Sequence, residues 1–365
     1  MKLAVSKYFL SIVAALFFVA LSSCDVHELP QTDFELVDYV IDLQYDTDFP
    51  LYKEVIYSRS DGAKGEIEES RATLYGYDVR YIIEVFSAAQ THVEGERPIK
   101  KFVFTKSAST ESIDNQVNIS LPEGVWDLYV WTDFVDQGSQ EDKYYKTSDF
   151  GNVTYTSQEE YCGSAASRPA FRGQKTVEVV HPYRFYEGET LPNYHIVIDN
   201  VPPMARYEFV STDVEEFIER LPFISSKFSE GRAFDPSRGL SRGDLEEFKV
   251  VFRYTAFMPS KFNIFSDKPT DAWTSVTYES YMDICDDGIV LGFDHVFVNG
   301  NEAMVNVAAD IYNGSNERIA SIPSIAVPLV RKKNTVVRGE FLSSYGSGGV
   351  GINPGFNGDY NIEIE

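Results

Sequence analysis

Runs in which apolar and polar residues alternate fill most of the chain after its first 35 residues. Residues 39–45 and 79–85 each place an apolar side chain at every second position. This period of two is typical of a strand that buries one face. The same pattern predicts further strands at residues 100–105, 116–121, 126–134, 175–180 and 194–199. Turn-rich segments separate these runs, which favours an all-β sandwich over βαβ units.

The second half of the chain continues the strand pattern after one interruption. Each of five segments reads as a strand or a pair of strands, at residues 248–265, 275–284, 288–299, 302–313 and 324–342. The interruption is STDVEEFIERL, residues 211–221, where the apolar residues Val214, Phe217, Ile218 and Leu221 fall on one helical face. The hydroxyl and acidic residues that open this segment can cap a helix. One short helix near residues 211–221 is therefore expected.

A pair of prolines marks the predicted boundary between two domains. Pro202 and Pro203 cannot lie in a regular central strand, because proline has no backbone N–H to donate. The length after the leader also suits two domains better than one. We predict two β-sandwiches in tandem, at residues 36–201 and 202–365.

The start of the chain has the layout of an export signal. Lys2 and Lys7 precede an apolar segment that ends in LSSC at Cys24. The apolar segment is shorter than the roughly 20 residues that a transmembrane helix needs. Leu21 to Cys24 resemble the lipobox cleaved by lipoprotein signal peptidase. We expect residues 1–23 to be removed, Cys24 to carry acyl chains, and residues 24–35 to form a tether; an ordinary signal peptide is the alternative.

The charge of the chain excludes one class of partner. Removing the signal takes away Lys2 and Lys7 and no acid, so the formal net charge falls from −24 to −26. Such a chain repels nucleic acid and anionic lipid surfaces. We read the acidity as solubility in the medium outside the inner membrane.

Motifs for catalysis and metal binding are not found in the sequence. The five histidines show no HExxH or HxH spacing, and neither a G-x-S-x-G elbow nor a P-loop occurs. No cofactor or metal is expected. Cys162 and Cys285 are too few for a disulfide framework, and either one long-range disulfide or two separate thiols fits the sequence.

An aromatic strand is the candidate for ligand contact. In GVWDLYVW, alternation places Trp126 on one face and Tyr129 and Trp131 on the other. Tyrosine and tryptophan rings stack well on sugars. These three residues are therefore candidate glycan contacts. The alternative is that one face is core and the other packs on a loop or a neighbouring domain.

The last residues form a second candidate, for assembly. In DYNIEIE, Tyr360, Ile362 and Ile364 alternate with polar residues, which predicts a strand after a glycine-rich span. We expect this strand to complete the C-terminal sandwich, either in its own chain or in a neighbour.

Several segments carry a family resemblance. The lipobox, RPAFRG at 168–173, VPLVRKKNTVVRGEFL at 327–342 and GGVGINPGFNGDYNIEI at 348–364 are similar to segments of the fimbrillin-like lipoproteins of Bacteroidales. That superfamily comprises fimbrial shaft, anchor and tip subunits, and the chain resembles its anchor branch more than the shaft proteins. The resemblance implies two transthyretin-like β-sandwich domains, a lipid anchor in the outer membrane with palmitate among its acyl chains, and other fimbrial subunits as partners.

The resemblance also implies assembly by β-strand complementation, in which a strand from one subunit fills a groove in the next. In those families a protease cleaves after an arginine in a loop. Arg59 and Arg71 stand on polar segments where a protease could reach them. They are candidate processing sites; the alternative is that both are plain surface arginines in a subunit that is never processed.

The sequence thus predicts a non-enzymatic structural or adhesive subunit of a fimbria-like cell-surface assembly. It is expected at the cell outer membrane, exposed at the surface, where it would contact a host or bacterial surface ligand. A glycan-binding surface lipoprotein is the alternative.

Overall fold

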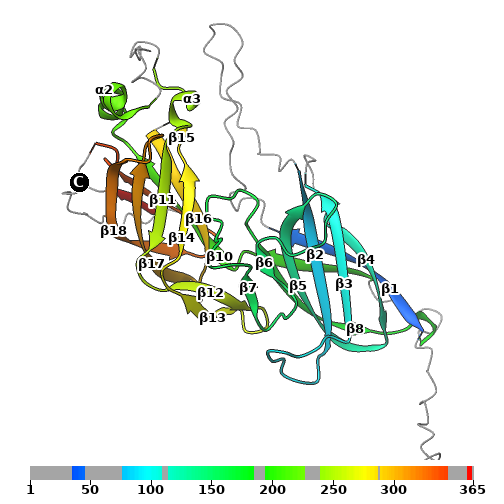
Figure 1. Cartoon of the computed structure of the whole chain (residues 1–365). Coiled ribbons are helices and arrows are strands. Elements are labelled where there is room, and N and C mark those ends of the chain that lie inside the picture. The colour runs from blue at the N-terminus through cyan, green and yellow to red at the C-terminus, as the bar shows by residue number, and fades with distance from the viewer. Residues whose placement is uncertain are drawn as a thin grey trace, which may run out of the picture.

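The computed structural model describes residues 35–45, 76–108, 114–184, 194–226, 239–286, 288–343 and 360–363. The all-β prediction is confirmed: strands dominate the described residues, and the chain forms two halves that lie end to end (Figure 1). The predicted boundary falls between strand β9, which ends at Val201, and strand β10, which begins at Met204 in a different sheet.

The N-terminal half is built on one seven-stranded sheet. Its order is β3-β2-β5-β8-β9-β1-β4, and only β1 and β9 run parallel. The strands are β1 (Leu36–Tyr45), β2 (Tyr77–Ser87), β3 (Lys100–Ser107), β4 (Gln116–Pro122), β5 (Gly124–Asp136), β8 (Phe171–Val179) and β9 (His195–Val201).

This sheet curls until its two ends meet. Lys100 Nζ on β3 donates a hydrogen bond of 3.0 Å to the carbonyl oxygen of Ser120 on β4, the opposite end of the strand order. The curl encloses one face of every strand. On β1 the alternate residues Val37, Tyr39, Ile41 and Leu43 are all buried, as a period of two requires.

The C-terminal half is a sandwich of two sheets. The first, in the order β15-β16-β10-β19-β20, contains β10 (Met204–Ser211), β15 (Asp283–Cys285), β16 (Gly288–Phe297), β19 (Asn334–Gly339) and β20 (Tyr360–Glu363). The second, in the order β14-β11-β17-β18, contains β11 (Lys249–Tyr254), β14 (Thr277–Tyr281), β17 (Glu302–Tyr312) and β18 (Arg318–Val330). Phe209 and Phe252 meet between the sheets with ring centroids 5.5 Å apart.

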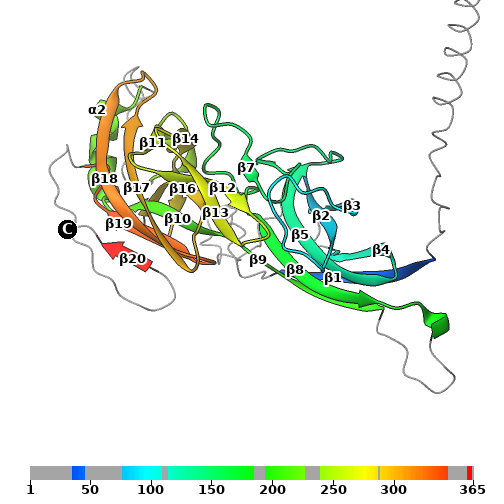
Figure 2. The same cartoon turned by 90° about the horizontal axis from the view of Figure 1, so that it is seen from below.

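A third, smaller sheet joins the two halves. Its order is β13-β12-β7-β6, where β6 (Tyr145–Lys146) and β7 (Val153–Tyr155) come from the N-terminal half and β12 (Met258–Asn263) and β13 (Lys268–Trp273) from the C-terminal half. Phe262 pairs with Val153, and Lys261 pairs with Thr154. Both views place this sheet between the lobes (Figures 1 and 2). Main-chain pairing therefore crosses the predicted boundary.

The predicted helix is present but begins later than expected. Helix α2 spans Val214–Ile224 and buries Phe217 and Leu221, as its apolar face predicts. The capping prediction is wrong: Asp213 is the N-cap residue, but its carboxylate makes no bond to the helix and accepts the N–H of Leu342 at 2.9 Å. Two short helical elements were not predicted, the 3₁₀ helix η1 (Pro182–Arg184) and helix α3 (Arg242–Leu245). No helix of the described segments is long and apolar enough to cross a membrane.

Gly173 tests the pairing of β8 with β9 inside the N-terminal sheet, because it lies opposite Asn200 on β9. A Cβ at Gly173 would clash with Asn200 Oδ1 and would lie 2.7 Å from Ile198 Cγ2. Gly173→Ala should therefore cost roughly 1–3 kcal/mol of unfolding free energy, measured from the urea midpoint. Gly243→Ala on α3 is the control, since the nearest heavy atom is 3.9 Å away. Equal midpoints for the two variants would contradict the described β8–β9 pairing.

Candidate functional site

Several predicted site residues lie outside the described residues. These are the lipidation candidate Cys24, the processing candidates Arg59 and Arg71, and Ile364 of the candidate assembly strand. The structure therefore places none of them.

The aromatic residues of β5 do not form one exposed surface. Trp131 is completely buried and Tyr129 is 4% exposed. The Trp131 ring packs on Tyr145 with centroids 5.3 Å apart, and Tyr129 packs at 4.9 Å on Phe265 of the C-terminal half. The Trp131 ring thus packs against β6, and the Tyr129 ring packs against the C-terminal half. Neither face of the Trp131 ring is open to a sugar. The structure therefore contradicts the prediction that Trp131 and Tyr129 contact a glycan, because both side chains are buried.

Trp126 lies on the opposite face of the same strand. It is partly buried, and its indole Nε1 donates a 2.8 Å hydrogen bond to the carbonyl oxygen of Pro122. Residues 128–135 of β5 are all buried, so the strand is covered on both faces there. The three predicted glycan residues do not converge on a single site.

The side chains of residues 155–168 instead dock the N-terminal half onto the C-terminal sandwich. Arg168 makes an ion pair with Asp294 on β16, and both side chains are almost completely buried. The guanidinium also donates to the carbonyl oxygen of Cys162 at 2.9 Å and to the Tyr161 hydroxyl. It lies over the rings of Tyr155 and Tyr161, 4.6 Å and 4.2 Å from their centroids.

Asp294 is satisfied by further donors from both halves. Its Oδ2 accepts the hydroxyls of Tyr161 at 2.9 Å and Tyr254 at 2.6 Å. The Tyr207 hydroxyl extends the network to Tyr254 at 3.0 Å. A buried charge is tolerated only when it is paired and fully hydrogen-bonded, and this arrangement meets that condition.

The contacts around Arg168 and Asp294 form the seam between the two halves. The low polarity of this seam shifts the pKa values of the acid and the phenols buried in it. Burial raises the pKa of Asp294, opposed by Arg168 and by the hydrogen bonds from Tyr254 and Tyr161. Burial also raises the pKa of Tyr155 to about 12 and that of Tyr254 well above its ordinary value. The phenols therefore stay protonated at neutral pH. Tyr254 can then donate to the Asp294 carboxylate, and Tyr155 donates to the carbonyl oxygen of His295.

The sequence signal for this network is weak. The segment RPAFRG does not by itself mark Arg168 as a buried cation. Asp294 lies next to His295 in the otherwise apolar, fully buried strand β16, which is the clearer sign of a satisfied buried acid. No disulfide joins Cys162 to Cys285 in the part of the chain that the structure describes.

The candidate assembly strand forms an edge of the C-terminal sandwich. β20 lies beside β19 in parallel pairing, with Tyr360 in register with Thr335 and Ile362 with Val337 (Figure 2). Thr335 and Val337 are completely buried. The strand thus pairs within its own chain, at the end of the strand order.

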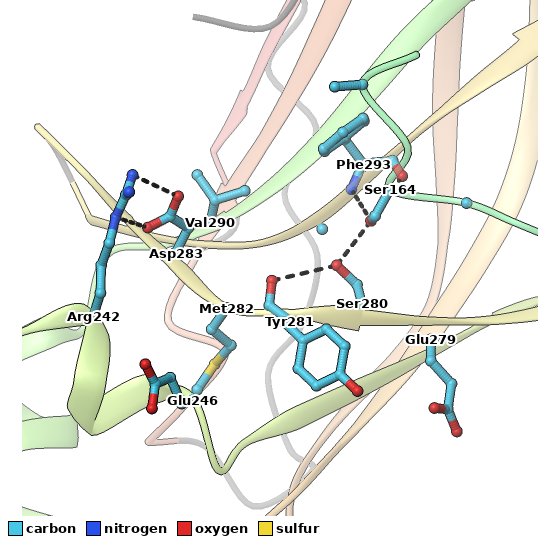
Figure 3. A pocket seen from close by; sticks show the side chains of 13 residues that line it. Ser164, Arg242, Glu246, Glu279, Ser280, Tyr281, Met282, Asp283, Val290 and Phe293 are labelled. Atoms are coloured by element: carbon cyan, nitrogen blue, oxygen red, sulfur yellow. Dashed lines mark hydrogen bonds and ion pairs between the residues drawn. The ribbon is translucent and has the colours of Figure 1, made fainter. Parts of the chain in front are cut away.

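A hollow of about 500 Å³ opens at the other edge of the same sandwich. It lies where β14 and β15 meet β16, and it is bounded by α3 and by residues 163–166 of the N-terminal half (Figure 3). Ser164 Oγ contacts Ser280 Oγ at 2.8 Å and accepts the backbone N–H of Phe293 at 3.0 Å. Across the hollow, Arg242 donates to Asp283 at 2.9 Å. Among the described residues, no group of three acids, histidines or cysteines could hold a metal ion.

Replacement of Arg168 tests the seam. Arg168→Met leaves Asp294 buried without its cation, which should cost about 3–5 kcal/mol of unfolding free energy by urea titration. The control is Lys106→Met, which breaks the exposed pair of Lys106 with Asp114 and should cost no more than about 1 kcal/mol. Adding Asp294→Leu to Arg168→Met should recover part of the loss. Equal costs for Arg168→Met and its control would show that the buried pair does not support the fold.

Solved structures resemble the chain at low identity. The fimbrial anchor protein Mfa2 from Porphyromonas gingivalis matches at 8% identity with a TM-score of 0.32, covering 67% of this chain and 73% of that one. A proposed cell adhesion protein from Bacteroides eggerthii matches at 10% identity with a TM-score of 0.40, covering 86% and 90%. A proposed polysaccharide-binding protein from Bacteroides thetaiotaomicron matches at 10% identity with a TM-score of 0.39, covering 78% and 79%. These values are too low to carry an argument about fold or function.

The sequence comparisons give a family. No curated protein matches the chain. Residues 41–365 match the sequence profile of a family of unknown function, DUF6562. This match spans both halves and the joining sheet, and the chain therefore belongs to the DUF6562 family.

Proposed function

We propose that the chain is a non-enzymatic subunit of a cell-surface assembly, held in the outer membrane by acyl chains on Cys24. The observation that carries this proposal is the parallel edge pairing of β20 with β19. A strand held only at a sheet edge contributes main-chain hydrogen bonds that a neighbouring subunit could equally receive. Other subunits of the same assembly are then the partners.

The arrangement of the two halves suits this role. Leu36, the first residue of β1, lies at the end of the N-terminal half that is remote from the C-terminal sandwich (Figures 1 and 2). A lipid tether that ends at β1 would therefore hold one end of the molecule, and β20 would lie toward the other. The seam between the halves lets the chain span this length as one unit.

Strand exchange gives β20 its proposed role. Tyr360 and Ile362 alternate with Asn361 and Glu363, a pattern that suits one buried and one solvated face. An edge left unpaired would expose the backbone of β19 to aggregation. We infer that β20 completes the sandwich in its own chain until a neighbour accepts it. Arg59 and Arg71 are proposed to remain uncleaved, which suits a subunit that keeps its anchor.

The anchor is tested by Cys24→Ser. Without acyl chains we expect either an uncleaved precursor or release of the protein from the membrane fraction, read by immunoblot after fractionation. Cys162→Ser, at an exposed cysteine, is the control and should fractionate like the parent chain. A processed Cys24→Ser protein that stays in the membrane fraction would rule out this anchor.

The strand is tested by deleting residues 358–365. If β20 serves only its own chain, the melting temperature should fall by at least about 4 °C. If it is donated, incorporation into surface assemblies should be lost while the melting temperature holds. Ile362→Asp should reproduce the deletion, and Asn361→Asp, with the same added charge at the alternate position, should not. Unchanged melting temperature and unchanged incorporation in the deletion variant would refute the role.

A further inference from the structure

The hollow beside β14 has a size typical of a small-molecule site. Its volume of about 500 Å³ falls within the range of roughly 300–1,000 Å³ that ligand pockets occupy. Five consecutive residues, 279–283, line it. Because side chains alternate between faces along a strand, a run of this kind shows that the hollow faces the backbone edge of the strand.

The backbone of β14 presents hydrogen-bonding groups to this hollow. β14 is the last strand of its sheet in the described residues. The backbone N–H of Tyr254 on β11 donates to the carbonyl oxygen of Val276 at 2.9 Å. From Val276 onward, every second residue therefore directs its backbone N–H and C=O groups toward β11. The groups of Tyr278 and Ser280 therefore point to β11, and those of Glu279 and Tyr281 point away from it.

An exposed aromatic ring stands at the same edge. The Tyr281 side chain is 67% exposed, although the residues on either side of it, Ser280 and Met282, are buried. In Figure 3 its ring extends between the carboxylates of Glu246 and Glu279. A tyrosine offers an apolar face for stacking and a hydroxyl for hydrogen bonding.

The hollow is too short for an added strand. Ser164 crosses it at one end by bonding to Ser280 and Phe293, and the Arg242–Asp283 pair closes the other end. Between these closures only Tyr281 and Met282 remain, which is fewer residues than the three to ten that strands usually have. A compact ligand fits this edge better than an extended peptide.

The charges of the hollow suit a neutral ligand. Glu279 pairs with Lys249 at 2.9 Å and Asp283 pairs with Arg242, so these carboxylates need no counter-charge from a ligand. The formal net charge of −24 on the whole chain disfavours anionic ligands. Carboxylates, backbone carbonyls and backbone N–H groups together accept from and donate to a ligand with many hydroxyls.

We propose that this hollow, at Tyr281, is a binding site for a neutral saccharide of one to three units. The sugar ring stacks on Tyr281, and its hydroxyls bond to the edge of β14 and to the carboxylates of Glu246 and Glu279. The inference supplies a ligand class for the adhesive role and rests on the proposed surface function. It moves the candidate glycan contact from β5 to the far edge of the C-terminal sandwich.

The test uses the full chain, purified in a detergent without a sugar headgroup, on an array of neutral saccharides of one to three units. The strongest binder is then titrated by calorimetry. Tyr281→Ala should weaken binding at least tenfold, whereas Tyr281→Phe keeps the ring and should retain most of it. Tyr183→Ala is the matched control, because Tyr183 on η1 is 65% exposed and lies in the other half.

The melting temperature of each variant should stay at the parent value, because both tyrosines are exposed. The proposal is overturned if no neutral glycan binds, if Tyr281→Ala and Tyr183→Ala behave alike, or if the hollow binds peptides in place of sugars. Binding by purified protein needs neither anchor nor assembly. Its failure is thus distinguishable from failure of the membrane and incorporation tests above.

Discussion

The ion pair between Arg168 and Asp294 is the interaction on which the two-part structure depends. Both groups are almost completely out of contact with water, so each needs the other and a full set of hydrogen bonds to remain there. The bonds to Tyr161, Tyr254 and the Cys162 carbonyl come from both sides of the predicted boundary. The segment that carries Arg168 is therefore fixed against the C-terminal sandwich.

Fixing this segment has consequences beyond stability. Residues 163–166 lie just before Arg168 and form one wall of the hollow beside β14. Ser164 bonds to strands of both sheets, and the ion pair four residues further on helps to fix its segment there. The proposed ligand site is thus built from both halves. Loss of the seam contacts would therefore disturb the proposed ligand site as well as the connection between the two halves.

The seam also bears on what a surface subunit must do. The proposed tether at one end and the proposed exchangeable strand toward the other would transmit force only if the chain between them does not bend freely. Main-chain pairing in the small sheet, aromatic packing of Tyr129 on Phe265 and the buried ion pair all resist such bending. Two sandwiches on a flexible linker would lack these contacts.

Much of the fold could be predicted from alternation, and little of the site. Residues 79–85 lie in β2 and the apolar face of residues 211–221 lies in α2, because local periodicity determines which side chains share a face. Alternation does not say what covers a face, and so Trp131 was predicted as a ligand contact although it is buried. The pairing of Val153 with Phe262 spans more than a hundred residues and leaves no local pattern. The hollow at Tyr281 likewise arises where three distant segments meet.

The claim that the two halves behave as one unit is tested most directly by differential scanning calorimetry of the full chain. We expect a single transition whose calorimetric and van't Hoff enthalpies agree, because the buried seam couples the unfolding of one half to that of the other. Two separate transitions, each with the enthalpy of one sandwich, would contradict this account.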